Sequence, residues 1–226
     1  MPDAARNAMT APLAIDLFCG LGGWTDGLLA AGYYVVGFDI IRHDHDGMRY
    51  PGQLVIQDVS TLHGAQFKDA ALIVASPPCQ EYSYMSLPFR RGKEKEREIL
   101  ADTSGEKLAA LTFLFRECFR IHEEACRAAD RHIPLVVENV KGAQKFVGRA
   151  RCHFGAFYLW GDVPALMPIR TGSAGVKCGG DWFNADRPSI SRTTSSRSRA
   201  RAAAVAQISK IPFELSHYIG KFYAPH

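Results

Sequence analysis

The chain has 226 residues, of which 47% are hydrophobic, and a formal net charge of +4. This composition suits one globular domain, since a disordered chain has fewer apolar residues and a membrane protein has longer apolar runs. The first twenty residues contain Asp3, Arg6 and Asp16 and no long apolar core, which argues against a secretory signal. We therefore expect a cytoplasmic protein that does not associate with membranes.

Short apolar segments alternate with helical patterns along most of the chain. In chain order we expect a strand at 13–18, a helix at 24–31, strands at 33–39, 54–58 and 71–78, a helix at 105–130, and a strand at 133–140. The apolar run at 154–167 should complete the sheet, and a short helix at 211–223 should begin at Pro212. Strands that are apolar on both faces and alternate with helices predict a parallel α/β sheet covered on both sides.

Two segments do not follow this alternation. Residues 81–104 contain a run of mixed charge at 90–98, which we interpret as a solvent-exposed loop that enters a helix. Residues 170–206 are rich in Gly, Ser, Arg and Ala and have little periodicity, so they predict a loop or a small subdomain. The chain has no internal repeat.

The basic excess is concentrated in one short stretch without any acidic residue. Without its five arginines, the chain has 22 basic residues against 23 acidic ones. Such a stretch suits contact with phosphate, but the serines and threonines between the arginines suit a solvated loop equally well. The arginines are Arg187, Arg192, Arg197, Arg199 and Arg201.

A glycine-rich loop follows the first predicted strand, with Gly20, Gly22 and Gly23 before a helix. Glycines allow a close approach of a ligand to the backbone, and a helix start presents free N–H groups, although plain strand–helix turns have the same pattern. The spacing differs from the dinucleotide-binding G-x-G-x-x-G motif. Asp39 and Asp58 stand at the next two strand ends, where carboxylates either bind a nucleoside or cap a turn.

Two further strand ends carry groups that suit catalysis. Pro77 and Pro78 stop the fourth strand abruptly and hold Cys79 at the carboxyl edge of the sheet, where open α/β sheets bind ligands. Glu138 ends the next apolar strand, and a carboxyl group in apolar surroundings can deliver a proton. The alternative interpretations are a buried structural cysteine and an ordinary acidic residue at a strand end.

The other cysteines carry no such signal. Six cysteines are too few for a disulfide scaffold in a chain of this length, and no two form a C-x-x-C pair. We therefore expect reduced thiols and no metal site. The six are Cys19, Cys79, Cys118, Cys126, Cys152 and Cys178.

Five short motifs together resemble those of the carbon-5 cytosine DNA methyltransferases. In order, they are DLFCGLGG (16–23), GFD (37–39), QDV (57–59), SPPCQ (76–80) and ENV (138–140). The resemblance extends over residues 13–160 and, more loosely, the final helix. It implies a Rossmann-like methyltransferase sheet with a reduced target-recognition region, in a compact member of bacterial or bacteriophage type. The implied domains are a catalytic and cofactor-binding domain at 1–160, a target-recognition region at 161–206 and a returning helix at 207–226.

The resemblance also implies a role for each matching residue. Cys79 would be the nucleophile, Glu138 the partner of cytosine ring nitrogen 3, and Arg149 and Arg151 would line the cytosine pocket, unless these arginines are simply solvated. S-adenosylmethionine, released as S-adenosylhomocysteine, would contact Phe18, Gly20, Leu21, Gly22, Gly23, Asp39, Ile40, Asp58 and Val59. Within this set, Phe18 would lie against the adenine, Asp39 would bind the ribose and Asp58 the adenine amino group. DNA would contact Gln80, Ser83, Arg197, Arg199 and Arg201.

The expected function is methylation of cytosine carbon 5 in double-stranded DNA by a monomer that flips its target base. Two departures from the family pattern concern the nucleic-acid target. Only residues 152–206 are available for target recognition, and Ile208–Ile211 replace the usual Gly-Asn-x-Val turn. The same chemistry on RNA therefore stays open, since tRNA-acting relatives share the PPC and ENV motifs, as does a non-catalytic nucleic-acid-binding protein.

Overall fold

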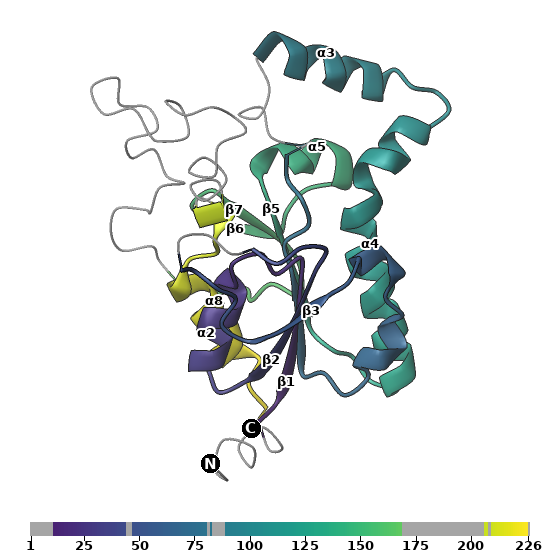
Figure 1. The fold of residues 1–226 in the computed structure, drawn as a ribbon. Helices are drawn as coiled ribbons and strands as arrows, with labels where there is room; N and C mark the ends of the chain where they lie inside the picture. Colours follow the sequence, from purple (N-terminus) through teal and green to yellow (C-terminus); the bar gives the residue numbers. More distant parts are fainter. Residues whose placement is uncertain are drawn as a thin grey trace, which may run out of the picture.

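The computed structural model describes residues 11–43, 47–80, 82, 89–168, 206–207 and 209–225. Figure 1 shows their arrangement around a central sheet. The elements, with η marking 3₁₀ turns, are β1 (Leu13–Leu17), α2 (Gly23–Ala30), β2 (Tyr34–Asp39), β3 (Gln53–Ile56), η1 (Val59–Thr61), η2 (Gly64–Phe67), β4 (Leu72–Ala75), α3 (Phe89–Leu100), α4 (Glu106–Ala129), β5 (Leu135–Asn139), η3 (Lys141–Ala143), α5 (Gln144–Val147), β6 (Cys152–Phe154), β7 (Phe157–Gly161) and α8 (Phe213–Phe222).

The sheet has seven strands in the order β3-β2-β1-β4-β5-β7-β6. Strands β1 to β5 are parallel, while β7 is antiparallel to both β5 and β6. The strand order reverses direction between β1 and β4, which is the feature that creates a ligand-binding crevice in doubly wound folds. The structure thus confirms the predicted α/β class, with a mostly parallel sheet in a doubly wound order.

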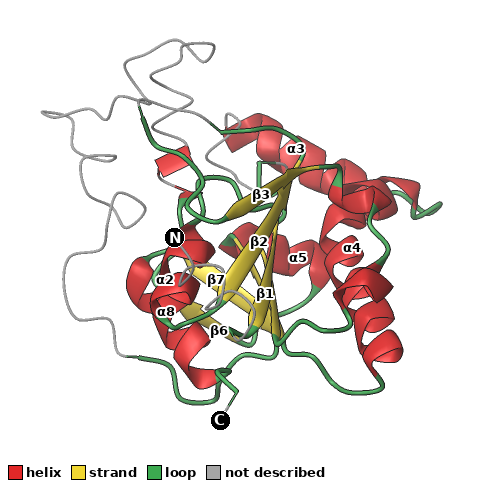
Figure 2. Cartoon of the chain, turned by 60° about the horizontal axis from the view of Figure 1, so that its bottom comes forward, coloured by secondary structure: helices red, strands yellow, loops and turns green. Residues whose placement is uncertain are grey.

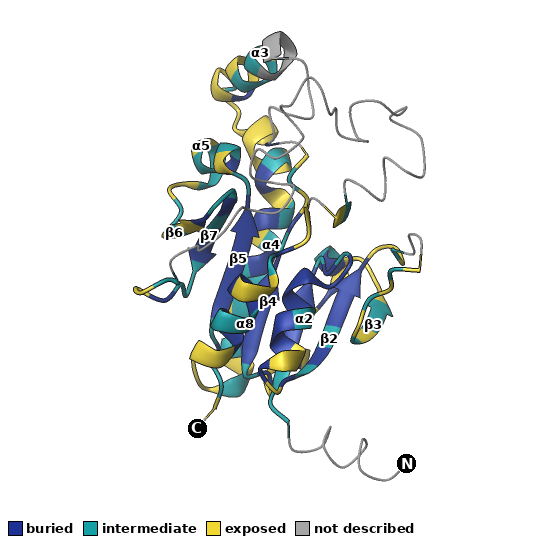
Figure 3. Cartoon of the chain, turned by 90° about the vertical axis from the view of Figure 1, so that its left-hand side faces the viewer, coloured by how far each residue is buried: buried dark blue, intermediate teal, exposed yellow. Residues whose placement is uncertain are grey.

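Helices cover both faces of the sheet (Figures 1 and 2). On one face, α2 and α8 bury a core that includes Trp24, Leu28 and Leu215. On the other face, α4 and the 3₁₀ turns η1 and η2 bury a larger core around residues such as Phe115 and Ile121. The central strands are accordingly buried on both sides (Figure 3), which explains their continuous apolar sequences.

The charged segment at 90–98 is helical, so its assignment to a loop was wrong. It lies within α3, where alternating Lys and Glu residues favour a helix through pairs spaced three or four residues apart. Lys93 Nζ lies 3.5 Å from a carboxylate oxygen of Glu96, and Lys145 of α5 contacts the same carboxylate at 2.6 Å. Among the side chains of α3 that are described, only Ile99 is buried, because nearly every other position is polar.

The remaining predicted elements lie close to their expected positions. The run at 154–167 supplies β7 and part of the β6–β7 hairpin that extends the sheet, and α8 begins directly after Pro212. Of the predicted target-recognition region, residues 169–205 lie outside the described part of the chain. Within the described residues, no helix combines the length and apolar character that crossing a bilayer requires.

Candidate active site

The strand register places the predicted catalytic residues at one edge of the sheet. Leu17 of β1 pairs with Ala75 of β4, and Ala75 pairs with Val137 of β5. Glu138 therefore lies one residue beyond this row on β5. Cys79 lies beyond the same row, in the loop after β4. Because parallel strands end on the same side, this is the carboxyl edge at which open α/β sheets bind ligands.

Two side-chain hydrogen bonds hold the loop that carries Cys79. Asn139 Nδ2 donates to the carbonyl oxygen of Pro77 at 3.0 Å, which ties the loop directly to the end of β5. Trp24 Nε1, on α2, donates to Ser76 Oγ at 3.0 Å from the other side. Cys79 is partly exposed, whereas Glu138 and Asn139 are buried. The cysteine is thus accessible from solvent on a loop fixed to the strand of the candidate proton donor.

The glycine loop combines an open position with a tightly packed one. Gly20 has a φ of +51°, and a Cβ atom built there would meet no atom of the described residues within 4 Å, so that these residues leave space for a ligand above it. A Cβ on Gly23 would lie 2.3 Å from the backbone nitrogen of Ile211. Gly23 therefore permits the close packing of the segment before α8, a reason for glycine that the sequence did not indicate.

Asp39 joins the glycine loop to the end of β2. Its Oδ2 accepts a hydrogen bond from the backbone N–H of Gly20 at 2.9 Å, and its Oδ1 lies 3.6 Å from His43 Nε2 and accepts from Ile41 N at 3.3 Å. Burial opposes ionisation of Asp39, but hydrogen bonds from His43, Gly20 and Ile41 outweigh it and lower the pKa of the carboxyl. The hydrogen bond between His43 and Asp39 also raises the pKa of His43. Asp39 is therefore an ionised acceptor.

These features fit an adenosyl group. The Asp39 carboxylate is 12% exposed and can accept hydrogen bonds from ribose hydroxyls. Ile40 beside it is an apolar side chain that is 64% exposed.

Asp58 is exposed, but its Oδ1 accepts hydrogen bonds from both the backbone N–H and the hydroxyl of Ser60, so it caps η1. The side chain of Val59 is buried in the larger core.

Three of the residues predicted to contact the cofactor, Phe18, Leu21 and Gly22, lie in different surroundings. Phe18 has a φ of +57°, which is uncommon for a side chain of its size, and it packs partly against the larger core. Leu21 is buried, and Gly22 also has a positive φ of +76°. The chain therefore turns sharply directly after β1, and this turn presents the backbone of the loop at the sheet edge.

A buried polar network beneath the loop was missed by the sequence analysis. Thr25 Oγ1 donates to Asp16 Oδ2 at 2.7 Å and lies 2.6 Å from the hydroxyl of Tyr50, which must then be the donor to Thr25. Asp16 is fully buried, and burial raises its pKa to about 7. Its Oδ1 has no hydrogen-bond partner among the residues that the structure describes. The only signal in the sequence was an acidic residue within the apolar strand LAIDLF.

The residues expected to contact nucleic acid are only partly within the described chain. Arg149 and Arg151 are both exposed, in a turn whose backbone is fixed by bonds from Trp160 Nε1 to Gly148 O at 3.0 Å and from Arg151 N to Leu159 O at 2.8 Å. Gln80 is exposed beside the candidate nucleophile. The expected contacts of Ser83, Arg197, Arg199 and Arg201 fall on residues outside the described part.

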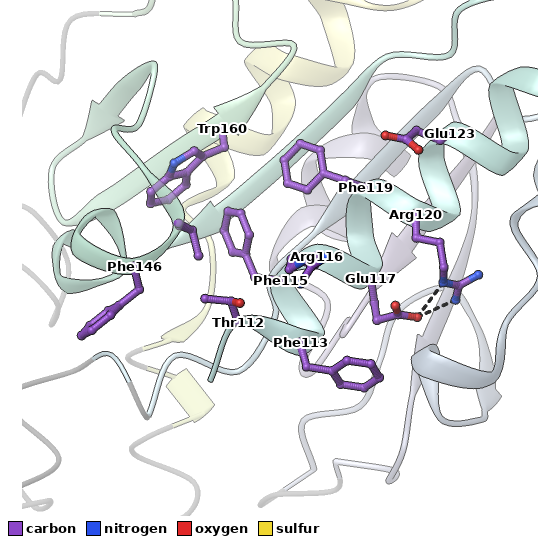
Figure 4. A pocket seen from close by; sticks show the side chains of 11 residues that line it. Thr112, Phe113, Phe115, Arg116, Glu117, Phe119, Arg120, Glu123, Phe146 and Trp160 are labelled. Atoms are coloured by element: carbon purple, nitrogen blue, oxygen red, sulfur yellow. Dashed lines mark hydrogen bonds and ion pairs between the residues drawn. The ribbon is translucent and has the colours of Figure 1, made fainter. Parts of the chain in front are cut away.

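An open groove of about 700 Å³ is lined mainly by residues of α4, together with residues of α5 and β7 (Figure 4). Its aromatic lining includes Phe115 and Trp160, whose rings meet edge to face with centroids 5.3 Å apart. None of the predicted catalytic or cofactor-binding residues lines it. The full lining is Thr112, Phe113, Phe115, Arg116, Glu117, Phe119, Arg120, Glu123, Phe146, Val147 and Trp160.

Comparisons with solved structures find several methyltransferases. A protein from an E. coli prophage, named as a DNA modification methyltransferase, is 25% identical with a TM-score of 0.38, and the match covers 59% of this chain and 33% of that one. The Dnmt2 methyltransferase of S. pombe is 16% identical, with a TM-score of 0.36 and coverage of 62% and 37%. The methyltransferase EhMeth of Entamoeba histolytica is 14% identical, with a TM-score of 0.36 and coverage of 62% and 41%. No curated protein sequence matches significantly.

The chain thus spans between a third and two-fifths of the length of these structures. A family model gives the stronger result, since that of the C-5 cytosine-specific DNA methylases matches residues 13–146, more than half of the chain. This range begins with β1 and includes the glycine loop, Asp39, Cys79 and Glu138. The motifs, their positions along one sheet edge and this match agree, and the chain belongs to the C-5 cytosine-specific DNA methylase family.

Proposed function

We propose that this protein transfers a methyl group from S-adenosylmethionine to carbon 5 of cytosine in double-stranded DNA, through a covalent adduct with Cys79. The observation that carries the proposal is the bond from Asn139 Nδ2 to the carbonyl oxygen of Pro77, at 3.0 Å. It fixes the cysteine loop to the strand that bears Glu138. The ionised Asp39 and the open space at Gly20 lie along the same edge of the sheet.

The cofactor would be held by the residues after β1 and β2. The Asp39 carboxylate would accept the ribose hydroxyls, Ile40 and Phe18 would contact the adenine, and the loop at Gly20 would hold the methionine part. Bound there, S-adenosylmethionine supplies an electrophilic methyl group for carbon 5 of the activated cytosine. The side chains of this protein would activate the cytosine.

Cytosine is a poor nucleophile at carbon 5, so it must first be activated. The Cys79 thiolate forms a bond to carbon 6, while Glu138 delivers a proton to ring nitrogen 3 and prevents negative charge from building up on the ring. After methylation, a base removes the proton from carbon 5, and the electrons of that bond form the carbon 5–carbon 6 double bond as the Cys79 thiolate leaves carbon 6. Ring nitrogen 3 then returns its proton to Glu138. An arginine near the sulfur, for which Arg149 and Arg151 are candidates, would favour the thiolate.

The target atom is inaccessible inside a stacked duplex, so the base must leave the helix before Cys79 reaches it. The partial exposure of Cys79, at the edge of the sheet rather than in its core, is compatible with such an approach. Gln80, exposed next to it, would contact the strand from which the base is taken.

Covalent trapping tests the proposal directly. DNA that carries 5-fluorocytosine should form a stable adduct in the presence of S-adenosylmethionine, because fluorine at carbon 5 prevents the final elimination. Cys79→Ala should form no adduct, whereas the control Cys152→Ala, which removes another partly exposed thiol, should form it normally. An equal adduct with Cys79→Ala would remove this residue from the mechanism.

The nucleic-acid substrate requires a second comparison. Duplex DNA and tRNA should be offered as methyl acceptors under the same conditions, with tritium-labelled S-adenosylmethionine. We expect methylation of DNA at cytosine carbon 5, which bisulfite sequencing locates. Methylation of tRNA alone would assign the same chemistry to RNA, and trapping without turnover on either would indicate that target recognition requires another component.

A further inference from the structure

A cluster of metal-ligating side chains lies at the opposite edge of the sheet from Cys79. His122 and Cys126 are one turn apart on α4, and His132 is in the connection to β5. One ligating atom from each of the three lies within 4.8 Å of the other two. Cys126 Sγ is 3.3 Å from His122 Nε2, and the rings of His122 and His132 meet edge to face with centroids 5.5 Å apart.

This geometry is close to what a zinc ion requires. Tetrahedral Zn²⁺, with bonds of about 2.3 Å to sulfur and about 2.0 Å to nitrogen, separates a sulfur from a nitrogen ligand by about 3.5 Å. The Cys126–His122 pair already has nearly this separation. His132 needs only a small side-chain adjustment, and its side chain is 60% exposed and can move without disturbing the core.

The surroundings of the cluster supply the outer hydrogen bonds that metal sites use. His132 Nε2 lies 3.0 Å from Asp162 Oδ2, which leaves His132 Nδ1 as the nitrogen available to an ion. A carboxylate that orients a ligating histidine in this way is typical of zinc sites. Ile133 N donates to Cys126 Sγ at 3.2 Å, a bond that would stabilise the charge of a metal-bound thiolate.

We propose that His122, Cys126 and His132 bind one Zn²⁺, with Asp162 orienting His132 and water in the fourth position. The Cys126 thiol loses its proton to solvent on binding. His122 Nε2 must give up its present partner, the carbonyl oxygen of Ile133 at 2.7 Å. The ion would link the end of α4 to the start of β5. Because Glu138 lies near the opposite end of this strand, the proposed role of the ion is to stabilise the fold.

Metal binding by the purified full-length chain tests this site. After removal of metal, the wild type should take up one Zn²⁺ per chain in competition with a chromophoric chelator. His132→Ala and Cys126→Ser should each weaken this binding at least tenfold, while the control Cys152→Ser should not. His132 is exposed, so its variant should keep the circular dichroism spectrum of the wild type.

Cobalt provides the second measurement. Saturating Co²⁺ should give a thiolate-to-metal charge-transfer band in the wild type, in His132→Ala and in Cys152→Ser, and none in Cys126→Ser. At the same subsaturating concentration, Zn²⁺ should also raise the thermal unfolding midpoint of the wild type more than that of His132→Ala. Wild-type affinity in His132→Ala, or the absence of Zn²⁺ uptake by the wild type, would overturn the proposal and leave the cluster as a purely hydrogen-bonded one.

Discussion

Replacement of Asp16 by asparagine should reveal how strongly the buried network beneath the glycine loop opposes ionisation. Asparagine has almost the same shape, and its Oδ1 can still accept the hydrogen bond from Thr25 that now goes to Asp16 Oδ2 at 2.7 Å. What the substitution removes is the possibility of a negative charge on a fully buried group. The comparison therefore isolates the free energy of that charge.

The pKa of Asp16 rises from an ordinary 3.8 to about 7, mainly because burial disfavours the charged form and, to a smaller degree, because of nearby Asp39. The native state thus keeps a proton that the unfolded chain has already released. Native stability falls as pH increases from about 4 to about 7, and the fall ends above the native pKa. This difference in the pKa of Asp16 between the unfolded and native states corresponds to about 4 kcal/mol.

Urea unfolding of the wild type and Asp16→Asn at pH 4.5 and pH 8 measures this effect. The stability of the variant relative to the wild type should increase by about 3–4 kcal/mol between the two values. Contributions from other groups, such as the lowered pKa of Asp39, change both proteins alike and largely cancel. Asp69→Asn, at an exposed position, is the matched control and should show no such increase. Parallel pH profiles for the wild type and Asp16→Asn would refute this reasoning.

Three further predictions concern the proposed activity. Asp39→Ala should weaken S-adenosylmethionine binding by about 1–3 kcal/mol, the value of a lost hydrogen bond to a charged group, and calorimetry that finds unchanged affinity would move the cofactor elsewhere. Asn139→Ala should lower kcat about tenfold, because it frees the Pro77 carbonyl and loosens the cysteine loop. Cofactor affinity should change little, and a loss of cofactor binding would instead indicate general misfolding. Replacing Arg197, Arg199 and Arg201 by alanine should reduce the slope of DNA affinity against salt by about 0.9 log units per lost phosphate contact, and a wild-type slope would identify a solvated loop.

The amino-acid sequence by itself determined the sheet and the order of the site motifs. The strand Leu72–Ala75 is apolar throughout and Leu135–Asn139 is apolar at its first three positions, a composition typical of strands that are buried on both faces. Once parallel strands are predicted, their carboxyl ends must meet at one edge, so the convergence of Asp39, Cys79 and Glu138 also followed. The mixed-charge run at 90–98 was misjudged, because alternating Lys and Glu suit an exposed helix as well as a loop.

Only the tertiary structure decided which side chains from distant segments interact. Tyr50 bonds to Thr25, which in turn bonds to Asp16. Gly23 is small because Ile211 packs against it, and Asn139 donates to a carbonyl group 62 residues earlier. Such contacts depend on how helices lie against the sheet, and local sequence patterns carry no information about that arrangement. His122, Cys126 and His132 likewise form no C-x-x-C motif that the sequence analysis could have detected. They come together because α4 ends close to the start of β5.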